Sequence, residues 1–169
     1  MNWQRYLIFG LIPLWAGLAV AADALSGPVG QALPDFSLIT LVGEEVTAQQ
    51  LQGKLLLLCF ASTEFPVCRD ALRELAIVSR RTRGKEVVIV WVALVSGNIQ
   101  ELSRTVLTEK IDFLVLTGDE RYLHHYTRRL GNMRILPTIF LIDRNGVIRE
   151  RWQGFRRADL LFTTLKQYL

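Results

Sequence analysis

Cysteine is scarce in this chain, because its 169 residues contain only Cys59 and Cys68. Two cysteines cannot build a disulfide scaffold, and they cannot supply a cysteine-rich zinc or iron–sulfur site. The sequence also contains no glycine-rich phosphate loop, HExxH motif or nucleophile elbow. His124 and His125 are neighbours on a predicted helix, so their side chains point about 100° apart and share no metal-binding face. We therefore expect no metal and no other cofactor.

No charge of one sign dominates the chain either. The 20 lysines and arginines are scattered among 16 aspartates and glutamates, which leaves a formal net charge of +4. The basic run Arg80, Arg81 and Arg83 precedes Gly84, and the last turn of a helix explains it better than a nucleic-acid patch does. We therefore expect no nucleic-acid partner. Half of the residues are hydrophobic, which excludes a disordered or fibrous chain, and the length suits one domain.

The amino-terminal segment is predicted to be an export signal. Residues 6–22 contain no charged side chain, and this length is at the lower limit of a membrane span. Glycines and a proline inside the run weaken it as a spanning helix, and residues 19–21 form an Ala-Val-Ala cleavage pattern. We predict a signal peptide over residues 1–21 that is cleaved after Ala21, with an uncleaved membrane anchor as the alternative.

The rest of the chain is predicted to be a linker over residues 22–34 and a single folded domain over residues 35–169. Cleavage and anchoring both place this domain outside the cytoplasm, in the periplasm or an equivalent space, where disulfides form and persist. Contact with a membrane is expected only through an uncleaved amino-terminal segment. No cysteine lies near the cleavage point, which excludes a lipid anchor there.

Strands and helices are predicted to alternate through the domain. Residues 55–60 form an apolar run that indicates a strand buried on both faces, and Pro66 fits the first turn of the next helix. The other predicted elements are a short strand or hairpin within 36–46, strands at 87–95, 113–116, 138–142 and 147–152, and helices at 98–110, 119–130 and 157–169. This order predicts an α/β domain whose mixed sheet is covered by helices on both faces.

The stretch from Cys59 to Cys68 carries the candidate chemistry. It runs from the buried strand through a short loop into a helix, and Cys68 falls in the first turn of that helix. The free N–H groups of a helix N-terminus stabilise a thiolate, so Cys68 is a candidate nucleophile. Cys68 also continues the apolar stripe of Ala71, Leu72 and Leu75, and a buried cysteine usually behaves as a small hydrophobic residue. From these residues alone, both interpretations stay open.

Two other segments resemble the exported thioredoxin-like proteins of the TlpA/ResA/DsbE type. One runs from Phe36-Ser37-Leu38 to Gly53-Lys54-Leu55, and the other from Leu136-Pro137-Thr138 to Gly146-Val147-Ile148. The resemblance covers the chain from about Leu33 onward, and it implies a thioredoxin-like fold. It also implies that Pro137 is a cis-proline that lies beside the active-site helix and shapes a peptide-binding edge.

The same resemblance exposes one departure from the family pattern. Members of that group carry W-C-x-x-C where this chain reads Glu64-Phe65-Pro66-Val67-Cys68. Phe65 therefore occupies the position of the attacking cysteine, and Cys68 that of the second, resolving cysteine. Ordinary exchange needs both thiols, so the standard dithiol cycle is not available here. Cys59 aligns with the position where thioredoxins hold a buried carboxylate, so a Cys59–Cys68 redox couple or static disulfide is an alternative.

Two hypotheses for the function follow. The leading one is thiol–disulfide oxidoreductase activity through Cys68 with Cys59 as its partner, with protein thiols or disulfides as substrates and a membrane thiol reductase as a possible partner. The other is a non-enzymatic module whose groove of Phe65, Pro66 and Pro137 binds an extended peptide. A peroxidase is disfavoured, because Phe65 stands where peroxiredoxins have Thr or Ser and Pro137 where they have Arg.

Overall fold

The computed structural model describes residues 28–94, 99–131 and 133–169. The predicted signal peptide, residues 1–21, lies outside these residues and remains a prediction. No helix in the described part of the chain is long and apolar enough to cross a bilayer. The backbone N–H groups of Gly30 and Leu33 donate to the carbonyls of Ile148 and Gly146, at 2.7 and 2.8 Å. This part of the predicted linker is therefore attached to the domain.

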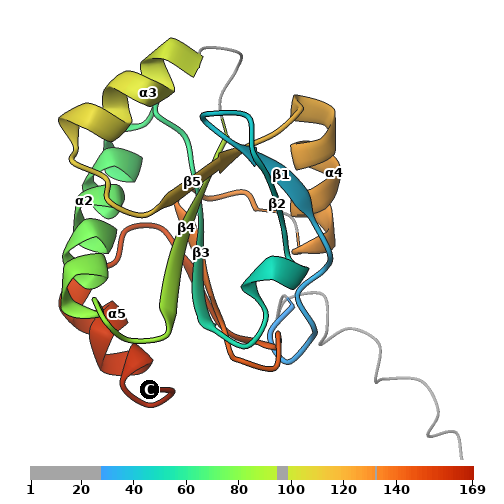
Figure 1. Cartoon of the computed structure of the whole chain (residues 1–169), viewed down its shortest axis with the longest axis vertical. Coiled ribbons are helices and arrows are strands. Elements are labelled where there is room, and N and C mark those ends of the chain that lie inside the picture. Colours follow the sequence, from blue (N-terminus) through green and yellow to red (C-terminus); the bar gives the residue numbers. More distant parts are fainter. Residues whose placement is uncertain (1–27, 95–98, 132) are drawn as a thin grey trace, which may run out of the picture.

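A seven-stranded mixed sheet forms the centre of the domain (Figure 1). Its strands lie in the order β2-β1-β5-β4-β3-β6-β7. Strand β4 is parallel to β3 and β5, whereas the remaining neighbours pair antiparallel. The bounds are β1 Ser37–Thr40, β2 Glu45–Thr47, β3 Leu55–Ala61, β4 Val87–Ala93, β5 Leu114–Thr117, β6 Thr138–Ile142 and β7 Ile148–Gln153. The mixed sheet confirms the α/β class predicted from the sequence.

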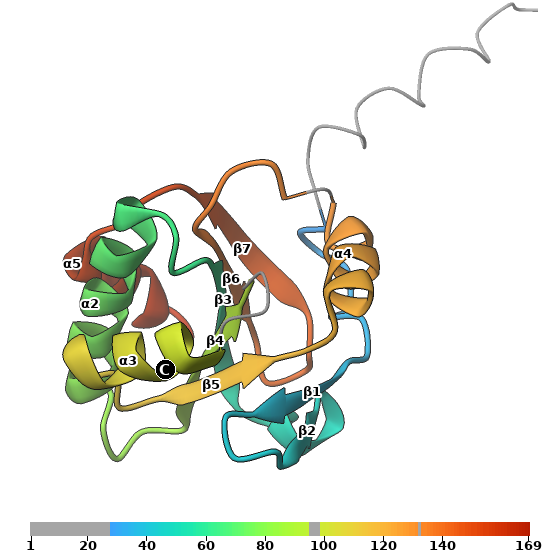
Figure 2. The same cartoon turned by 90° about the horizontal axis from the view of Figure 1, so that it is seen from above.

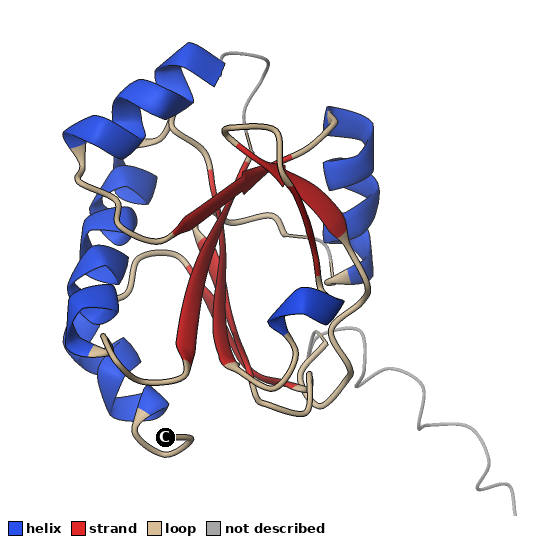
Figure 3. Ribbon diagram, viewed as in Figure 1, coloured by secondary structure: helices blue, strands red, loops and turns tan. Residues whose placement is uncertain are grey.

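Helices cover both faces of this sheet (Figures 2 and 3). Helices α2, α3 and α5 pack on one face, and α4 packs on the other. Their bounds are α2 Pro66–Arg81, α3 Ile99–Thr108, α4 Glu120–Arg129 and α5 Ala158–Leu165, and a short 3-10 helix η1, Gln49–Leu51, precedes β3. Both hydrophobic faces of the sheet are thereby removed from water, as the predicted architecture requires.

Strand β3 is buried along its whole length because it lies in the middle of the sheet under both helix layers. Leu55, Leu57, Cys59 and Ala61 face the cluster formed with α2, α3 and α5. The alternate residues, Leu56, Leu58 and Phe60, face the cluster formed with α4. This explains why the strand reads as a continuous apolar run instead of an alternating one.

Helix α2 begins where the sequence predicted, with Pro66 at its first position, and its last turn carries Arg80 and Arg81. Its buried stripe consists of Cys68, Ala71, Leu72, Leu75, Ala76 and Val78. On its outer side, Glu74 reaches helix α5, where Oε2 accepts a 2.6 Å hydrogen bond from the backbone N–H of Ala158. A carboxylate at a helix N-terminus is favourable, so Glu74 joins the two helices.

The turn between β6 and β7 is closed by Asp143. Its Oδ1 accepts hydrogen bonds from the backbone N–H groups of Asn145 and Val147, both at 2.9 Å, and its Oδ2 accepts one from Arg149 Nε at 2.7 Å. Burial raises the pKa of this carboxyl, but the hydrogen bonds from Val147, Arg149 and Asn145 outweigh it and hold the pKa below its ordinary value.

Of the predicted elements, the hairpin that was one alternative for residues 36–46 is confirmed, and the last helix ends earlier than predicted. The segment 36–46 forms a hairpin of β1 and β2, which turns at Gly43 with a φ of 85°. The last helix ends at Leu165, four residues before the predicted end. The backbone N–H groups of Gln167 and Tyr168 bond to carbonyls three residues back, so the chain tightens into turns there. His124 and His125 are both exposed on α4.

Candidate functional site

The loop between β3 and α2 is held by hydrogen bonds between side chains and its backbone. Ser62 and Thr63 are buried, and the Thr63 carbonyl accepts a 2.9 Å hydrogen bond from Arg69 Nη1. The backbone N–H of Glu64 donates to Ser62 Oγ at 3.3 Å. In the neighbouring strand, Trp91 Nε1 donates to the Ala61 carbonyl at 3.0 Å. The start of α2 is therefore fixed relative to the end of β3.

Phe65 lies at the corner where this loop becomes a helix. It is the N-cap residue of α2, in extended conformation, and its carbonyl accepts the backbone N–H of Cys68 at 3.0 Å. A phenylalanine side chain has no hydrogen-bond acceptor, so the first turn of the helix has no side-chain cap at Phe65. Its ring is instead 48% exposed, beside Val67 at 40%. The position thus presents an apolar group to solvent.

Pro137 reaches the same end of the sheet from the other side. The Leu136–Pro137 peptide bond is cis, as the resemblance implied. Because Phe60 pairs with Thr138, Pro137 lies level with the end of β3. Its carbonyl accepts a 2.8 Å hydrogen bond from the backbone N–H of Gly154, which follows β7. Three loops therefore meet at the carboxyl end of β3.

These loops expose further apolar side chains. Ile135, two residues before the proline, is 51% exposed, and Phe155, directly after Gly154, is 39% exposed. Pro137 itself is buried, so it shapes this surface more than it forms it. We call the surface the Phe65 edge and define it by Phe65, Val67, Ile135 and Phe155 around Pro137. Ile135 and Phe155 were not identified from the sequence. The only signals there are that Ile135 lies two residues before Pro137 and that Phe155 follows a glycine just after a predicted strand.

The two cysteines lie beneath this edge. Cys68 is the third residue of α2, and Cys59 is on β3 between Ile139 and Trp91 of the adjoining strands. Both belong to one hydrophobic cluster, both side chains are 0% exposed and both thiols are free. The predicted neighbours are thus in one cluster without a disulfide between them.

Burial also controls the acidity of both thiols. It raises the pKa of Cys59 far above its ordinary value, and the nearby Cys68 raises it further. Burial likewise raises the pKa of Cys68, although a hydrogen bond from the backbone of Ser62 acts in the opposite direction. Burial therefore favours the neutral form of both thiols.

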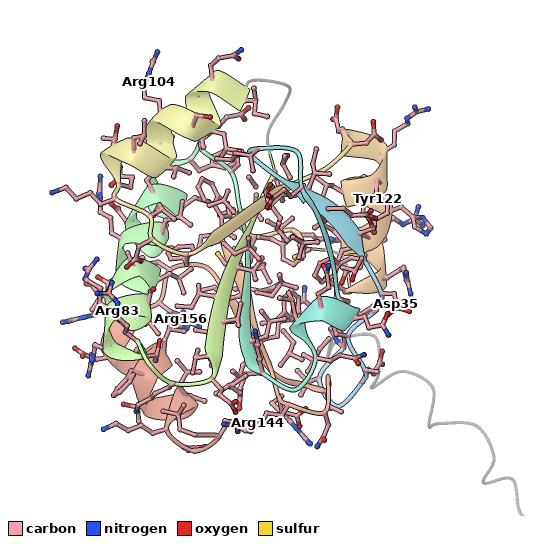
Figure 4. All side chains as sticks on the ribbon, viewed as in Figure 1. Asp35, Arg83, Arg104, Tyr122, Arg144 and Arg156 are labelled. Atoms are coloured by element: carbon pink, nitrogen blue, oxygen red, sulfur yellow. The ribbon has the colours of Figure 1, made fainter. Side chains whose placement is uncertain are left out.

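Other candidate sites in the described part of the chain are less suited to chemistry. No group of three or more His, Cys, Asp or Glu side chains there could hold a metal ion. A cleft of about 620 Å³ lies between the β1–β2 region and α4, lined by polar residues such as Asp35 together with Tyr122. Figure 4 shows these two residues on the side of the molecule away from α2, and neither cysteine lines the cleft.

Comparison with known proteins identifies the family. The model of the AhpC/TSA family matches residues 29–151, which is most of the domain. The chain belongs to the AhpC/TSA family. The thioredoxin-like protein YneN of Bacillus subtilis (strain 168) is 29% identical over 123 residues, which cover 72% of this chain and 69% of YneN. The predicted membership of the thioredoxin-like redoxins is thereby confirmed.

Solved structures agree with this assignment at the level of the fold. A thiol:disulfide interchange protein from Chlorobium tepidum TLS superposes with a TM-score of 0.72 at 22% identity, covering 83% of this chain and 96% of that one. StoA from Bacillus subtilis superposes with a TM-score of 0.63 at 22% identity, covering 76% and 94%. The fold is therefore thioredoxin-like.

Proposed function

We propose that this chain binds an extended segment of another protein at the Phe65 edge, without a catalytic dithiol cycle. The observation that carries the proposal is the pattern of exposure at the junction of β3 and α2, where an aromatic residue is exposed and both thiols are buried. Phe65 is 48% exposed at the helix corner, whereas Cys59 and Cys68 are 0% exposed. The site thus offers an apolar contact where its relatives offer an attacking sulfur.

The chemistry of the edge favours a protein segment with apolar side chains. Phe65, Ile135 and Phe155 are all more than a third exposed, and they come from three loops that meet beside Pro137. Burying a whole large apolar side chain contributes about 1.5–3 kcal/mol, so covering the exposed half of the Phe65 ring contributes about 1 kcal/mol. Aromatic residues at the centre of such a surface are the usual sites of large losses on truncation.

A peptide-binding assay tests this proposal. Fluorescein-labelled extended peptides with leucine or phenylalanine at the centre are titrated with the full chain, and anisotropy reports binding. We expect Phe65→Ala to weaken binding about fivefold, which corresponds to about 1 kcal/mol. Leu107→Ala is the matched control, because Leu107 is 78% exposed on α3 and lies outside the edge. Equal affinity of Phe65→Ala and the wild-type chain, with both folded, would contradict the proposal.

Thiol–disulfide exchange through Cys68 is the second candidate. It is favoured by the position of Cys68 in the first turn of α2 and by the backbone hydrogen bond from Ser62 to its thiol. In that cycle the Cys68 thiolate attacks a substrate disulfide, forms a mixed disulfide and releases one substrate thiol. Cys59 then attacks the Cys68 sulfur, releases the second substrate thiol and leaves a Cys59–Cys68 disulfide. A thiol reductase, in the membrane or outside it, must return two electrons to complete the cycle.

Alkylation of the native protein separates the two candidates. Iodoacetamide is applied at neutral pH before and after denaturation, and mass spectrometry locates the label on Cys59 or Cys68. A binding module leaves both thiols unlabelled until the chain unfolds, and Cys68→Ala retains peptide affinity. Rapid native labelling of Cys68, with mixed disulfides that disappear in Cys68→Ala, would favour the redox cycle instead.

We further propose that the domain works outside the cytoplasm, in the periplasm or an equivalent space. The support is the uncharged segment 6–22 with its Ala-Val-Ala cleavage pattern. Cell fractionation of a carboxyl-terminally tagged chain, followed by amino-terminal sequencing, tests this point. Cleavage after Ala21 or retention in the membrane fraction agrees with export, whereas an intact chain in the cytosol contradicts it.

A further inference from the structure

Parts of the chain that are distant in sequence meet at the end of the domain opposite to the Phe65 edge. Residues 30–33 are hydrogen-bonded to the β6–β7 turn, and the backbone N–H of Gly53 donates to the Arg144 carbonyl of that turn at 3.2 Å. The Arg144 side chain in turn donates to the carbonyl of Tyr168 at 2.6 Å. Strand β3 begins at this end and finishes at the Phe65 edge. Seven residues in a strand span about 23 Å, which is the separation of the two ends.

Cations gather at this end around one aromatic ring. Arg81 lies 4.2 Å, Lys166 5.0 Å and Lys85 5.7 Å from the centroid of the Phe162 ring. Arg81 is also paired with Asp159 at 2.7 Å. Among the described residues, neither lysine has an acidic partner within ion-pair distance. Two of the three cations around the Phe162 ring, Lys85 and Lys166, are thus without a paired acid in the part of the chain that the structure describes.

Arg144 extends this group toward the β6–β7 turn. Figure 4 shows it at the lower end of the molecule, near the carboxyl terminus that Figure 1 marks. Glu86 lies 3.9 Å from Arg144 and Asp159 lies 2.7 Å from Arg81, so each of these arginines is paired with an exposed acid. We call Arg81, Lys85, Arg144 and Lys166 the basic end. Its charge remains positive after both ion pairs are counted.

We propose that the basic end is a contact surface for an anionic lipid bilayer. Lysine and arginine side chains at a surface are attracted to anionic headgroups, and half-buried aromatic rings such as those of Phe162 and Tyr168 suit the interfacial region. Leu169, also at this end, is 41% exposed and adds an apolar contact. This combination fits a lipid surface better than an acidic protein, for which exposed apolar groups are not required.

The connectivity of the chain supports the same partner. The uncharged segment 6–22 precedes residues 30–33, which are held at the basic end by hydrogen bonds to the β6–β7 turn. A chain whose apolar segment enters or passes through a bilayer would bring this end, and not the Phe65 edge, toward the lipid. The Phe65 edge, at the other end of β3, would then face the aqueous compartment and stay open to a protein segment.

Lysine acetylation provides the test, because the chain has only four lysines and their positions are informative. Lys85 and Lys166 belong to the basic end, Lys54 lies beside it, and Lys110 is exposed in the turn after α3. The full chain is mixed with vesicles of phosphatidylcholine alone, or of phosphatidylcholine with one third phosphatidylglycerol. Acetylation by a water-soluble ester is then quantified at each lysine by mass spectrometry under single-hit conditions.

We expect phosphatidylglycerol to slow the acetylation of Lys85 and Lys166 about fivefold relative to Lys110, since each surface cation gains about 1 kcal/mol from an anionic leaflet. The protection should disappear in about 1 M NaCl, where the Debye length is about 3 Å. The proposal would be overturned if phosphatidylglycerol left the acetylation rates of Lys85 and Lys166, relative to that of Lys110, unchanged. Protection that needs an added acidic protein and not lipid would also overturn it.

A pair of double variants then assigns the effect to the basic end. Arg81→Gln with Arg144→Gln should abolish the roughly fivefold protection of Lys85 and Lys166, because each lost cation removes about 1 kcal/mol of attraction to the anionic leaflet. Arg104→Gln with Arg128→Gln removes the same charge from exposed positions on α3 and α4 and should leave the protection unchanged. Figure 4 shows Arg104 at the upper end, remote from Arg144. Equal protection in the two double variants, both with wild-type Tm, would contradict the assignment.

Discussion

Replacing Phe65 with cysteine should convert this site into a dithiol site. The change restores a Cys-Pro-Val-Cys sequence at the N-terminus of α2, where the backbone already has the required form. Phe65 is the N-cap residue and Cys68 is the third residue of the helix. Residues three apart at a helix turn have Cβ atoms about 5–6 Å apart, and a disulfide needs about 3.5–4.5 Å. A small closure of the first turn is therefore sufficient.

The energetic changes of Phe65→Cys are small enough for the fold to survive. The Phe65 ring is already 48% exposed, so its removal costs about 1 kcal/mol of packing. An oxidised loop of four residues restricts the unfolded chain by about 2 kcal/mol, which sets an upper limit for the stabilisation by the new disulfide. The introduced thiol also receives the dipole and free N–H groups of α2, which favour its thiolate form.

Insulin reduction by dithiothreitol is the assay for this variant. We expect insulin to precipitate at least ten times faster with Phe65→Cys than with the wild-type chain. Oxidation of the variant should also remove two reactive thiols, one from each cysteine of the new pair. Phe65→Ser is the matched control, because it removes the ring without adding a thiol. A folded Phe65→Cys variant that neither oxidises to a disulfide with Cys68 nor reduces insulin would refute the placement of Phe65 at the nucleophile position.

Three other predictions concern the scaffold that positions the site, each read from urea unfolding curves. Asp143→Ala should lower the free energy of unfolding by about 1–3 kcal/mol through three lost hydrogen bonds. Because folding lowers the pKa of Asp143, its contribution is full above an ordinary value of about 3.9 and declines as the pH falls through the lower folded value. An Asp143→Asn variant with the same acid sensitivity as the wild-type chain would contradict this. Glu74→Gln should cost about 0.5–1.5 kcal/mol by weakening the contact with the start of α5, whereas an unchanged midpoint would exclude that role. Trp91→Phe should cost about 0.5–1.5 kcal/mol, because the Ala61 carbonyl loses the indole donor and keeps only the backbone N–H of Leu94.

The sequence predicted the parts of this structure that depend on local patterns. The apolar run of β3 indicated a strand buried on both faces, and the stripe from Cys68 to Val78 indicated which side of α2 is buried. The same stripe already favoured a core position for Cys68, whereas the helix N-terminus favoured a nucleophile. Its 0% exposure agrees with the stripe, and burial raises the pKa of the thiol although the backbone hydrogen bond from Ser62 acts in the opposite direction.

Features that depend on tertiary contacts were not predictable in the same way. Ile135 and Phe155 are 20 residues apart in the chain, and nothing in their local sequence indicates that both border Pro137. The hydrogen bond from Gly154 to Pro137 brings them together, and only the pairing of β6 with β7 creates it. The cations around Phe162 are likewise contributed by the end of α2, the following turn and the end of α5.

Phenylalanine at position 65 is compatible with the close packing of both cysteines. In a dithiol site the inner thiol must be reached by the outer sulfur, which requires an opening toward solvent at the helix corner. With Phe65 at that corner no sulfur is available to reach inward, and the inner thiol can be packed as tightly as any other core group. Cys59 and Cys68 are packed in this way, because both are 0% exposed and burial raises the pKa of each. The fixed loop, the cis-proline and the exposed apolar side chains lie around them, and the proposed binding of a protein segment depends on these parts and on neither thiol.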